Sequence, residues 1–542
     1  MTAPYPPDEP PPPPYDGPHS DDFGPHDGGG HGGFSHNPGD RTDVPDASQG
    51  DDPCSGGSNP KSGNPIVLGT GNKVETEVDF TSAGEMPLTL ERTYDHYWSY
   101  IGIFGKYWVS NLDYSITIAA DESTIYAQRP DGRRIKFFRD PLDGNRWNED
   151  KGTGSDHIFC DGFDAPDRNP CSENGAASIA YITRSGSTYT HATEDNDTEL
   201  YDAEGRITRR TNAHGISWTF GYTNRLLTSV TRSSGRVSGV GRTMSLAWTN
   251  DTISVVSPDG SKFEYEFIPD AVDAGAKLLV ETRIAGDVGN PAVTIDYHYE
   301  DARFPGALTG KSFNGKRYST FAYDAYARVT DSKHAGSTPG TFVEAWHFDY
   351  TGVPSHPPLG GPADPPPPGV PCNPGPPHQC PANPIAPDSG TPTPASVEDA
   401  LVRLIPAAAS TVTETNPLGY KTTYTFANGQ LTAASSPASA HCGARASART
   451  YDAFGYDDHV TDFNGNVTDY DYAANGQLAQ KVQASGSAIA RTTSYTWDPA
   501  RNRPLTETVK GLEQTTYGYS PQNRIASITR KNLAPYGTPN QT

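Results

Sequence analysis

The chain has 542 residues, with 55 glycines, 50 prolines, 29 tyrosines and only 3 methionines. This turn-rich and aromatic-rich composition is typical of many short β-strands and argues against a helical enzyme. The formal net charge of −23 predicts a surface that repels nucleic-acid phosphate and anionic lipid, although an acidic surface also serves simply to keep a protein in solution.

The first 62 residues form a low-complexity segment that we expect to be disordered. It contains the proline run Pro10–Pro14 and several glycines, and it has almost no aliphatic residues to bury. The start of the chain shows no signal peptide, and no run approaches the ~20 apolar residues of a membrane span. The segment also holds irregularly spaced histidines, which we interpret as solvated and not as metal ligands: His19, His26, His31 and His36.

Residues 63–155 are predicted to form a small β domain. Apolar and acidic residues alternate over 74–79, which indicates a strand with one polar face. Further strands are expected at 116–119 and 125–127, with Phe104 and Trp108 anchoring the core. Residues 156–350 should then hold further strands and a first block of repeats.

The repeat is clearest between Tyr451 and Tyr472. A turn at 452–455 precedes a short strand, Asn464-Gly465 is a strong hairpin signal, and the returning strand ends on Tyr472. Tyr201 opens a similar unit that closes at Tyr222, again 21 residues later. A period in the low twenties predicts a repeat architecture in which stacked units bury a common aromatic face.

The recurring positions are given a structural role, since the ring packs between strands and the carboxylate holds a turn. Alanine occupies position 327, where the repeat predicts glycine. The recurring residues are Tyr201, Asp202, Gly205, Arg206, Gly215, Tyr222, Tyr323, Asp324, Arg328, Tyr451, Asp452, Gly455, Gly465, Tyr472, Tyr495, Gly511 and Tyr519.

A proline-rich insert, residues 351–398, interrupts the repeats. Seventeen prolines between 353 and 394 exclude a sheet, because proline lacks the donor that a strand ladder needs. We interpret the insert as a surface loop; a docking site for a proline-binding partner is the alternative. A single short helix is expected at 396–405. The second repeat block, 399–542, ends without a recognisable cap and is expected to be truncated.

The six cysteines include two close pairs, Cys160 with Cys171 and Cys372 with Cys380. No pair has the C-x-x-C spacing of zinc or redox sites, so we predict local disulfides and an oxidising compartment. The sequence does not pair Cys54 or Cys442.

Catalytic motifs are not found in the sequence. There is no G-x-S-x-G elbow, Walker loop or H-E-x-x-H motif. His441 and Cys442 are adjacent and would point to opposite faces of a strand. The segment 462–466 superficially resembles a calcium loop, but it lacks the downstream glutamate and is better explained as a turn. We therefore predict no enzyme activity, no catalytic residue, no cofactor and no metal site.

The Tyr-Asp openings, the following Gly-Arg and the distant aromatic-x-Tyr resemble the YD repeat of RHS-repeat proteins. The resemblance covers roughly residues 63–350 and 410–542, and it implies a spiral sheet that closes as a hollow shell. In many family members this shell holds a C-terminal toxin released by self-cleavage. The segment before the repeats resembles the RHS N-terminal domain in Gly63-Asn64-Pro65, Gly69-Thr70-Gly71-Asn72-Lys73, Asp79-Phe80, Pro87-Leu88, Arg92-Thr93-Tyr94 and 102–108.

Together these patterns predict an all-β protein: many short antiparallel strands in a YD-repeat spiral sheet or partial shell, preceded by a small β domain. The resemblance implies a non-catalytic shell segment of a secreted or surface-exposed bacterial toxin-delivery protein. This chain lacks the Asp-Pro-x-Gly-Leu motif that usually closes the array, so a toxin partner is expected to be encoded downstream. The alternative is a cell-surface module that binds carbohydrate or another cell, which would need aromatic rings on the outward face.

Overall fold

The computed structural model describes residues 60–149, 180–352 and 410–534. The Pro-rich insert and the expected helix at 396–405 lie outside these ranges. The described residues form strands and turns without any helix, so none is available to cross a membrane, and the predicted all-β fold is confirmed. Short gaps interrupt the ranges at 97–100, 120, 131–133, 194–196, 235–240, 272, 274, 287–290, 339, 428–429, 439–442, 453–455, 474–476, 499–502 and 521–524.

A small β domain opens the described chain. Five of its strands form one sheet in the order β1-β2-β3-β4-β7, and β5 pairs with β6. The strands are β1 (Lys61–Ser62), β2 (Ile66–Val67), β3 (Asn72–Thr81), β4 (Thr89–Asp95), β5 (Ile101–Gly102), β6 (Gly105–Lys106) and β7 (Trp108–Ser110).

The remaining 30 strands, β8 to β37, belong to one large sheet, and each pairs antiparallel with the next strand in the sequence. In its first half the strands are β8 (Ser115–Ile118), β9 (Thr124–Gln128), β10 (Arg134–Arg139), β11 (Arg146–Glu149), β12 (Tyr181–Ser185), β13 (Thr188–Ala192), β14 (Thr198–Tyr201), β15 (Ile207–Thr211), β16 (Ser217–Thr223), β17 (Leu226–Ser233), β18 (Arg242–Trp248), β19 (Thr252–Val256), β20 (Lys262–Pro269), β21 (Lys277–Ile284), β22 (Val293–His298) and β23 (Gly310–Phe313).

The second half continues the same pattern. It consists of β24 (Lys316–Tyr323), β25 (Val329–Ala335), β26 (Phe342–Thr351), β27 (Ser410–Thr415), β28 (Lys421–Ala427), β29 (Gln430–Ser436), β30 (Arg445–Tyr451), β31 (Asp457–Thr461), β32 (Val467–Tyr472), β33 (Leu478–Gln483), β34 (Arg491–Trp497), β35 (Pro504–Val509), β36 (Glu513–Tyr519) and β37 (Ile525–Asn532).

This serial pairing gives the sheet two rims. Because consecutive strands run in opposite directions, every turn from an even- to an odd-numbered strand lies on the same rim. The turns that follow Tyr201, Tyr323 and Tyr451 lie there, and we call it the YD rim. The turns from odd- to even-numbered strands, such as those containing Gly215 and Gly465, lie on the other rim, which we call the distal rim.

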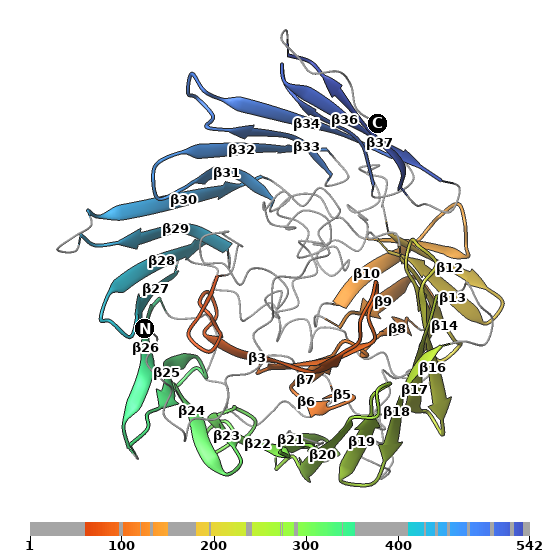
Figure 1. Cartoon of the computed structure of the whole chain (residues 1–542), viewed down its shortest axis with the longest axis vertical. Helices are drawn as coiled ribbons and strands as arrows, with labels where there is room; N and C mark the ends of the chain where they lie inside the picture. Colours follow the sequence, from red (N-terminus) through yellow and green to blue (C-terminus); the bar gives the residue numbers. More distant parts are fainter. Residues whose placement is uncertain are drawn as a thin grey trace.

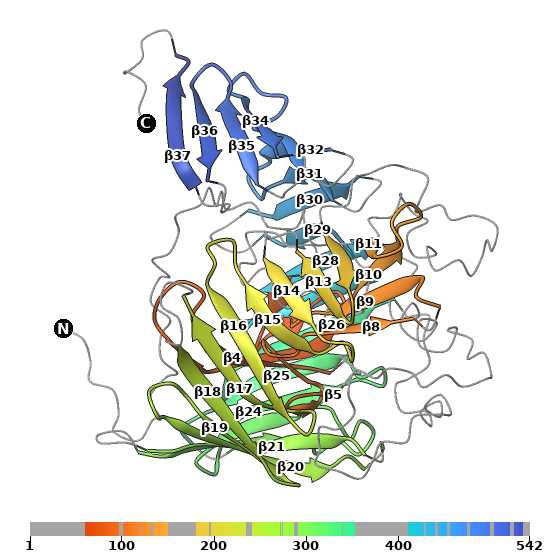
Figure 2. The same cartoon turned by 90° about the vertical axis from the view of Figure 1, so that its right-hand side faces the viewer.

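The large sheet winds around the small domain. Figure 1 shows the strands following one another around the view, with β3 and β7 on the inner side. In Figure 2 the last strands, β30 to β37, lie above the earlier ones, so the sheet rises as it turns. Twist accumulated between neighbouring strands is the physical source of such winding. The predicted spiral is therefore observed.

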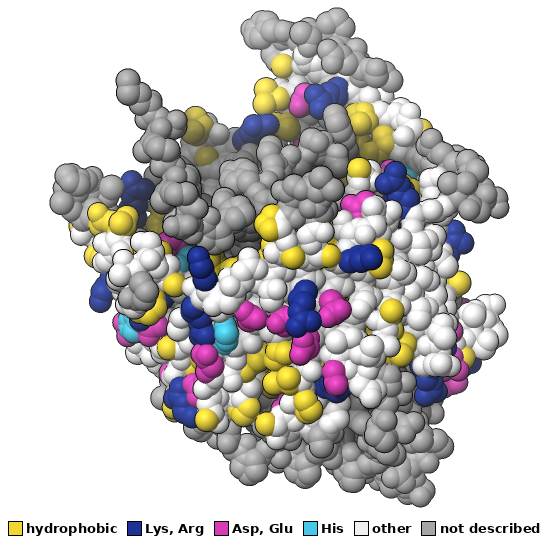
Figure 3. Space-filling model, turned by 60° about the horizontal axis from the view of Figure 1, so that its bottom comes forward, with side chains coloured by type: hydrophobic (Ala, Val, Ile, Leu, Met, Phe, Trp, Pro, Cys, Tyr) yellow, Lys and Arg dark blue, Asp and Glu magenta, His cyan; other side chains and the backbone are white. Residues whose placement is uncertain are grey.

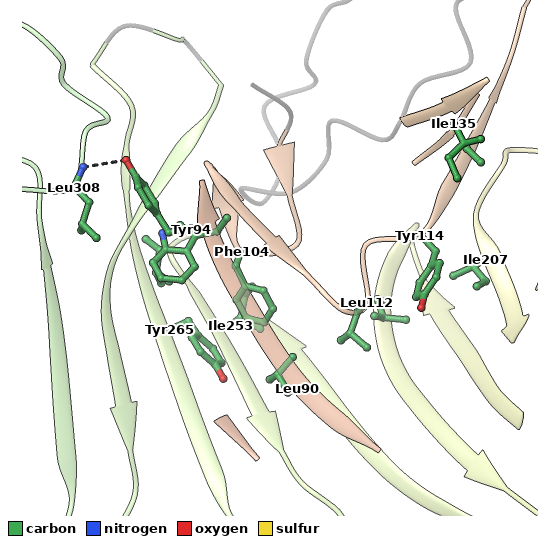
Figure 4. Packing of buried hydrophobic residues seen from close by; sticks show 14 of the residues in the cluster. Leu90, Tyr94, Phe104, Leu112, Tyr114, Ile135, Ile207, Ile253, Tyr265 and Leu308 are labelled. Carbon is green, nitrogen blue, oxygen red and sulfur yellow. Dashed lines mark hydrogen bonds between the residues drawn. The ribbon is translucent and has the colours of Figure 1, made fainter. Parts of the chain in front are cut away.

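The core lies between the small domain and the sheet. Tyr94 and Phe104 of the small domain approach Tyr265 of β20 and Leu308 of the β22–β23 connection, and the Leu308 amide donates to the Tyr94 hydroxyl at 2.9 Å (Figure 4). Among the described residues, the central cluster of buried apolar side chains extends no further than Leu431. The strands beyond it therefore contribute little to this core.

The polar face of β3 is turned toward the sheet. Glu75, Glu77 and Asp79 are partly buried, whereas Val78 between them is 52% exposed. The alternation predicted the strand, but its acidic face is the inner one because cations of β4 and β23 meet it there.

Candidate functional site

The charged side chains of the YD turns bind one another within the same turn. The Asp202 carboxylate accepts hydrogen bonds from the Arg206 amide at 2.9 Å and the Arg206 Nε at 2.8 Å. Asp324 holds Arg328 in the same way, at 3.0 and 2.8 Å. Asp452 accepts from a backbone amide of its turn, and Gly455 lies outside the described residues. The geometry is that of a turn clamp, because Asp202 and Asp324 each bind both the amide and the guanidinium of the arginine four residues later.

Close packing explains one glycine of these turns. Gly205 has φ +77°, and a Cβ there would lie 2.0 Å from the carbonyl oxygen of Ile116 in β8. The Ile116 amide donates to the Gly205 carbonyl at 2.9 Å, so the first strand of the sheet rests directly on the first YD turn. Ala327, at the equivalent place in a later turn, adopts φ +58° without a glycine.

The closing aromatic residues follow a β-bulge. The strand register shifts between Gly221 and Tyr222, and the Tyr222 hydroxyl donates to the Ile207 carbonyl of the preceding strand at 2.9 Å. The same shift precedes Tyr519, whose hydroxyl donates to the preceding strand at 2.7 Å. A shift also precedes Tyr323 and Tyr472. The bulge aims each ring at the adjacent strand, and the sequence pattern did not reveal it.

One opening residue differs from its sequence assignment. Tyr495 lies within β34, and Trp497 is the strand's last residue, next to Asp498. The Trp497 indole N–H donates to the carbonyl of Leu478 at 2.8 Å, as the tyrosines do in other units. Trp497 thus occupies the aromatic position of this turn.

The distal turns are local structures. Gly215, Gly465 and Gly511 all adopt positive φ, between +74° and +82°. The Asp462 carboxylate accepts from the Asn464 and Asn466 amides at 2.8 and 2.9 Å. The stretch that resembles a calcium loop therefore has the geometry of an Asx turn.

A buried arginine joins the small domain to the sheet. Arg92 is fully buried and forms a bidentate pair with Asp79 at 2.6 and 2.9 Å. Its guanidinium lies 4.8 to 5.4 Å from the ring centres of Phe104, Trp108 and Tyr265. Although burial opposes the charge, the Asp79 carboxylate holds the pKa of Arg92 well above its ordinary value.

A second buried network lies beside it. Lys311 of β23 contacts Glu75 and Glu77 of β3 at 2.5 and 2.7 Å, and Lys73 also contacts Glu75 at 2.5 Å. Burial lowers the pKa of Lys73 to about 8. Burial alone would raise the pKa of Glu75, but the two lysines lower it to about 2. The network is therefore charged at neutral pH and fixes β3 against the sheet.

The arrangement most similar to a catalytic group is centred on Glu199. This carboxylate accepts from Arg129 at 2.6 and 2.9 Å and from the Tyr201 hydroxyl at 2.7 Å, and it contacts His191 Nδ1 at 3.0 Å. His191 packs edge-to-face on Phe137 at 5.1 Å. His191 and Glu199 are both 0% exposed, so a substrate has no direct access to them. The cluster anchors Tyr201 instead.

One histidine group has a spacing compatible with a metal ion. Potential ligand atoms of Asp458, His459 and Asp469 lie within 4.8 Å of one another. However, the two ring nitrogens of His459 face different carboxylates, at 2.8 and 3.7 Å. The hydrogen bond to Asp458 raises the pKa of His459. The geometry fits an ion pair with a protonated imidazole.

The cysteines cannot be placed. Cys160, Cys171, Cys372 and Cys380, like Cys54 and Cys442, lie outside the described residues. Their pairing stays a prediction.

Two family models match the chain. One, described as a domain of unknown function (DUF6531), matches residues 63–137, and the RHS repeat matches residues 201–237. The chain therefore contains an RHS repeat. The matched repeat contains the Asp202 clamp and the bulged Tyr222.

Solved structures with some likeness to this chain include a crystal structure of TcdB2-TccC3, with 11% identity and a TM-score of 0.36, covering 84% of this chain and 25% of that one. Another is a Photorhabdus luminescens Tc holotoxin pore carrying a TccC3 D651A mutation, with 10% identity and a TM-score of 0.21, covering 89% and 27%. The chain spans about a quarter of the length of these structures. A search of curated proteins found no match.

Proposed function

We propose that the chain is a non-catalytic wall segment of a shell that carries a toxin. The cargo would be a C-terminal toxin domain of the same polypeptide, and the assembly would act outside the producing cell. The winding of the large sheet around an inner side carries this proposal (Figure 1).

The pairing of each strand with its neighbour in the sequence is compatible with a shell wall built from repeats. Because each strand of the large sheet pairs with its sequence neighbour, another repeat can be added at the edge of β37 without rearranging the preceding ones. The charged clusters also support a scaffold, since Arg92 and Glu199 are enclosed between packed elements and hold them together. These features supply rigidity and not a reaction centre.

The exposure of aromatic residues favours a shell over a sugar-binding module. A surface that stacks on sugars needs exposed aromatic rings, but Tyr201, Tyr265 and Phe348 of the repeats are buried. In the described part of the chain, the large exposed apolar residues include two aromatics, Phe342 and Tyr420. Tyr201, Tyr265 and Phe348 therefore act as core.

The test is the native polypeptide itself. Antibodies against the small domain would capture it from the producing cells, and its intact mass and the transcript past the codon for Thr542 would be read. We expect a mass above 58.1 kDa, with further Tyr-Asp repeats and a variable tail. A native 58.1 kDa chain without a neighbouring toxin or immunity gene would overturn the proposal, and binding to a glycan panel would then be tested.

A further inference from the structure

The two rims of the large sheet differ in their charge chemistry. On the YD rim, Arg206 and Arg328 each pair with the aspartate of their own turn, at 2.7 Å. Arg503 pairs likewise with Asp498 at 2.6 Å. These guanidinium groups are thus neutralised locally.

Unpaired cations line the distal rim. Six even-numbered strands start there with an exposed lysine or arginine, and further cations lie near the last turn and at the end of β37. None of them forms an ion pair within the described residues. Acidic residues of the same rim include Asp259 and Asp462, which bind amides of their own turns, and the exposed Glu513. The cations are Arg242, Lys262, Lys316, Lys421, Arg445, Arg491, Lys510 and Lys531.

The same rim carries exposed apolar side chains in its second half. Seven of the twelve large exposed hydrophobic residues of the described chain lie there, at hairpin turns or strand ends of β26 to β37. Ile489 is 82% exposed and Leu418 is 80% exposed. The seven are Phe342, Val343, Leu418, Tyr420, Ile489, Leu512 and Leu533.

Backbone contacts show that the last two distal hairpin tips and the end of β37 are neighbours. The Lys510 amide donates to the Thr492 carbonyl at 2.9 Å, and the Leu533 amide donates to the Leu512 carbonyl at 2.7 Å. Ile489, Leu512 and Leu533 therefore form a row with Arg491, Lys510 and Lys531 beside it. We call these six residues the distal-rim row.

We infer that the distal-rim row binds the surface of an anionic phospholipid bilayer. Lysine and arginine would contact lipid phosphates, while the apolar tips would enter the headgroup region. Peripheral membrane-binding surfaces commonly combine these two kinds of contact. This inference does not depend on the toxin-delivery proposal.

The spacing favours a bilayer over an acidic protein partner. Turns on one rim recur every second strand, about 10 Å apart, so the apolar tips are separate points. A protein interface needs a contiguous packed patch and is depleted in lysine. A fluid bilayer accommodates isolated tips with lysines between them.

The net charge of −23 does not prevent this contact. At physiological salt the Debye length is about 8 Å, so charges elsewhere on the molecule are largely screened at the rim. The face in Figure 3 carries interspersed basic and acidic side chains. Arg283 near the end of β21 pairs with Glu264 and Glu266 of β20, so some cations close to the distal rim are paired, unlike the eight named above.

Vesicle co-sedimentation of the full chain tests the inference, using phosphatidylcholine vesicles with and without 30% phosphatidylglycerol. Two matched pairs of variants separate the rims. Arg491→Gln at the distal rim is compared with Arg225→Gln, since Arg225 is also exposed but lies in a turn on the YD rim. Ile489→Ser is compared with Ile268→Ser, which is 45% exposed near the YD rim.

We expect binding only to the anionic vesicles, weakened by 0.5 M NaCl. Arg491→Gln should lower the partition coefficient about fivefold, the factor equivalent to ~1 kcal/mol per basic residue, and Ile489→Ser should lower it several-fold. Both YD-rim variants should bind as the parent does, and all four should retain its melting temperature.

Three outcomes would overturn the inference. One is failure of the parent chain to bind anionic vesicles. Another is an equal loss of binding in the matched YD-rim variants. The third is self-association of the chain, seen by light scattering and abolished by Ile489→Ser, without any vesicle binding; the row would then be an interface between copies.

Discussion

Arg92→Ala tests how much the buried Arg92–Asp79 ion pair of the small domain, which faces the large sheet, stabilises the protein. The substitution leaves the Asp79 carboxylate, itself 3% exposed, without its bidentate partner and opens a space among three aromatic rings. Removing one partner of a buried ion pair costs roughly 3–5 kcal/mol. Unfolding of the whole chain in urea, followed by tryptophan fluorescence, measures the loss.

Arg283→Ala is the control. Arg283 also pairs with several glutamates, but its side chain is 48% exposed, so a cost of about 0–1 kcal/mol is expected. The double variant Arg92→Met with Asp79→Leu removes both buried charges and should recover much of the loss. If Arg92→Ala costs as little as Arg283→Ala, the reasoning about the inner polar face of β3 is wrong.

Three further changes probe the repeats and the small domain. Gly205→Ala places a Cβ 2.0 Å from the Ile116 carbonyl, whereas Gly465→Ala at similar φ meets open space; the first should lower the melting temperature distinctly more. Tyr222→Phe removes the 2.9 Å hydrogen bond from the Tyr222 hydroxyl to the preceding strand and should cost about 1 kcal/mol in urea unfolding; no measurable cost would contradict the role given to the bulge. Burial lowers the pKa of His96 to about 4. An unfolded histidine binds its proton near pH 6.5, so His96 does not reduce the free energy of unfolding above that pH. As the pH falls from about 6.5 to about 4, protonation of the unfolded state lowers that free energy by ~3 kcal/mol. His96→Gln should flatten the dependence of stability on pH between these two values, and an unchanged dependence would refute the assignment.

The sequence predicted the repeat because turn chemistry is local. An aspartate that binds the amide four residues later and a glycine with positive φ leave a recognisable pattern around Asp202 and Asp462. The all-β class and the spiral followed from that periodicity and from the family resemblance. The bulge before Tyr222 depends on the neighbouring strand and leaves no comparable signal.

Two features depend on contacts that a one-dimensional pattern does not contain. The acidic face of β3 is typical of a solvated strand face until Lys311, more than 230 residues later, is placed opposite Glu75. The total charge of −23 gives no indication that exposed cations gather on the distal rim. Lys421 and Arg491 are far apart in sequence, and only strand alternation places them on one rim.

The ion pairs of Lys311 bear on how the chain folds during synthesis. Each hairpin of the large sheet can form as soon as its second strand emerges, since its partner is the preceding strand. Glu77, however, lies 234 residues before Lys311. At a translation rate of about 5–20 residues per second, Lys311 is synthesised roughly 10–50 s after Glu77. The small domain is therefore completed late, although it leaves the ribosome before the large sheet, and through that interval its acidic strand remains hydrated and available to chaperones.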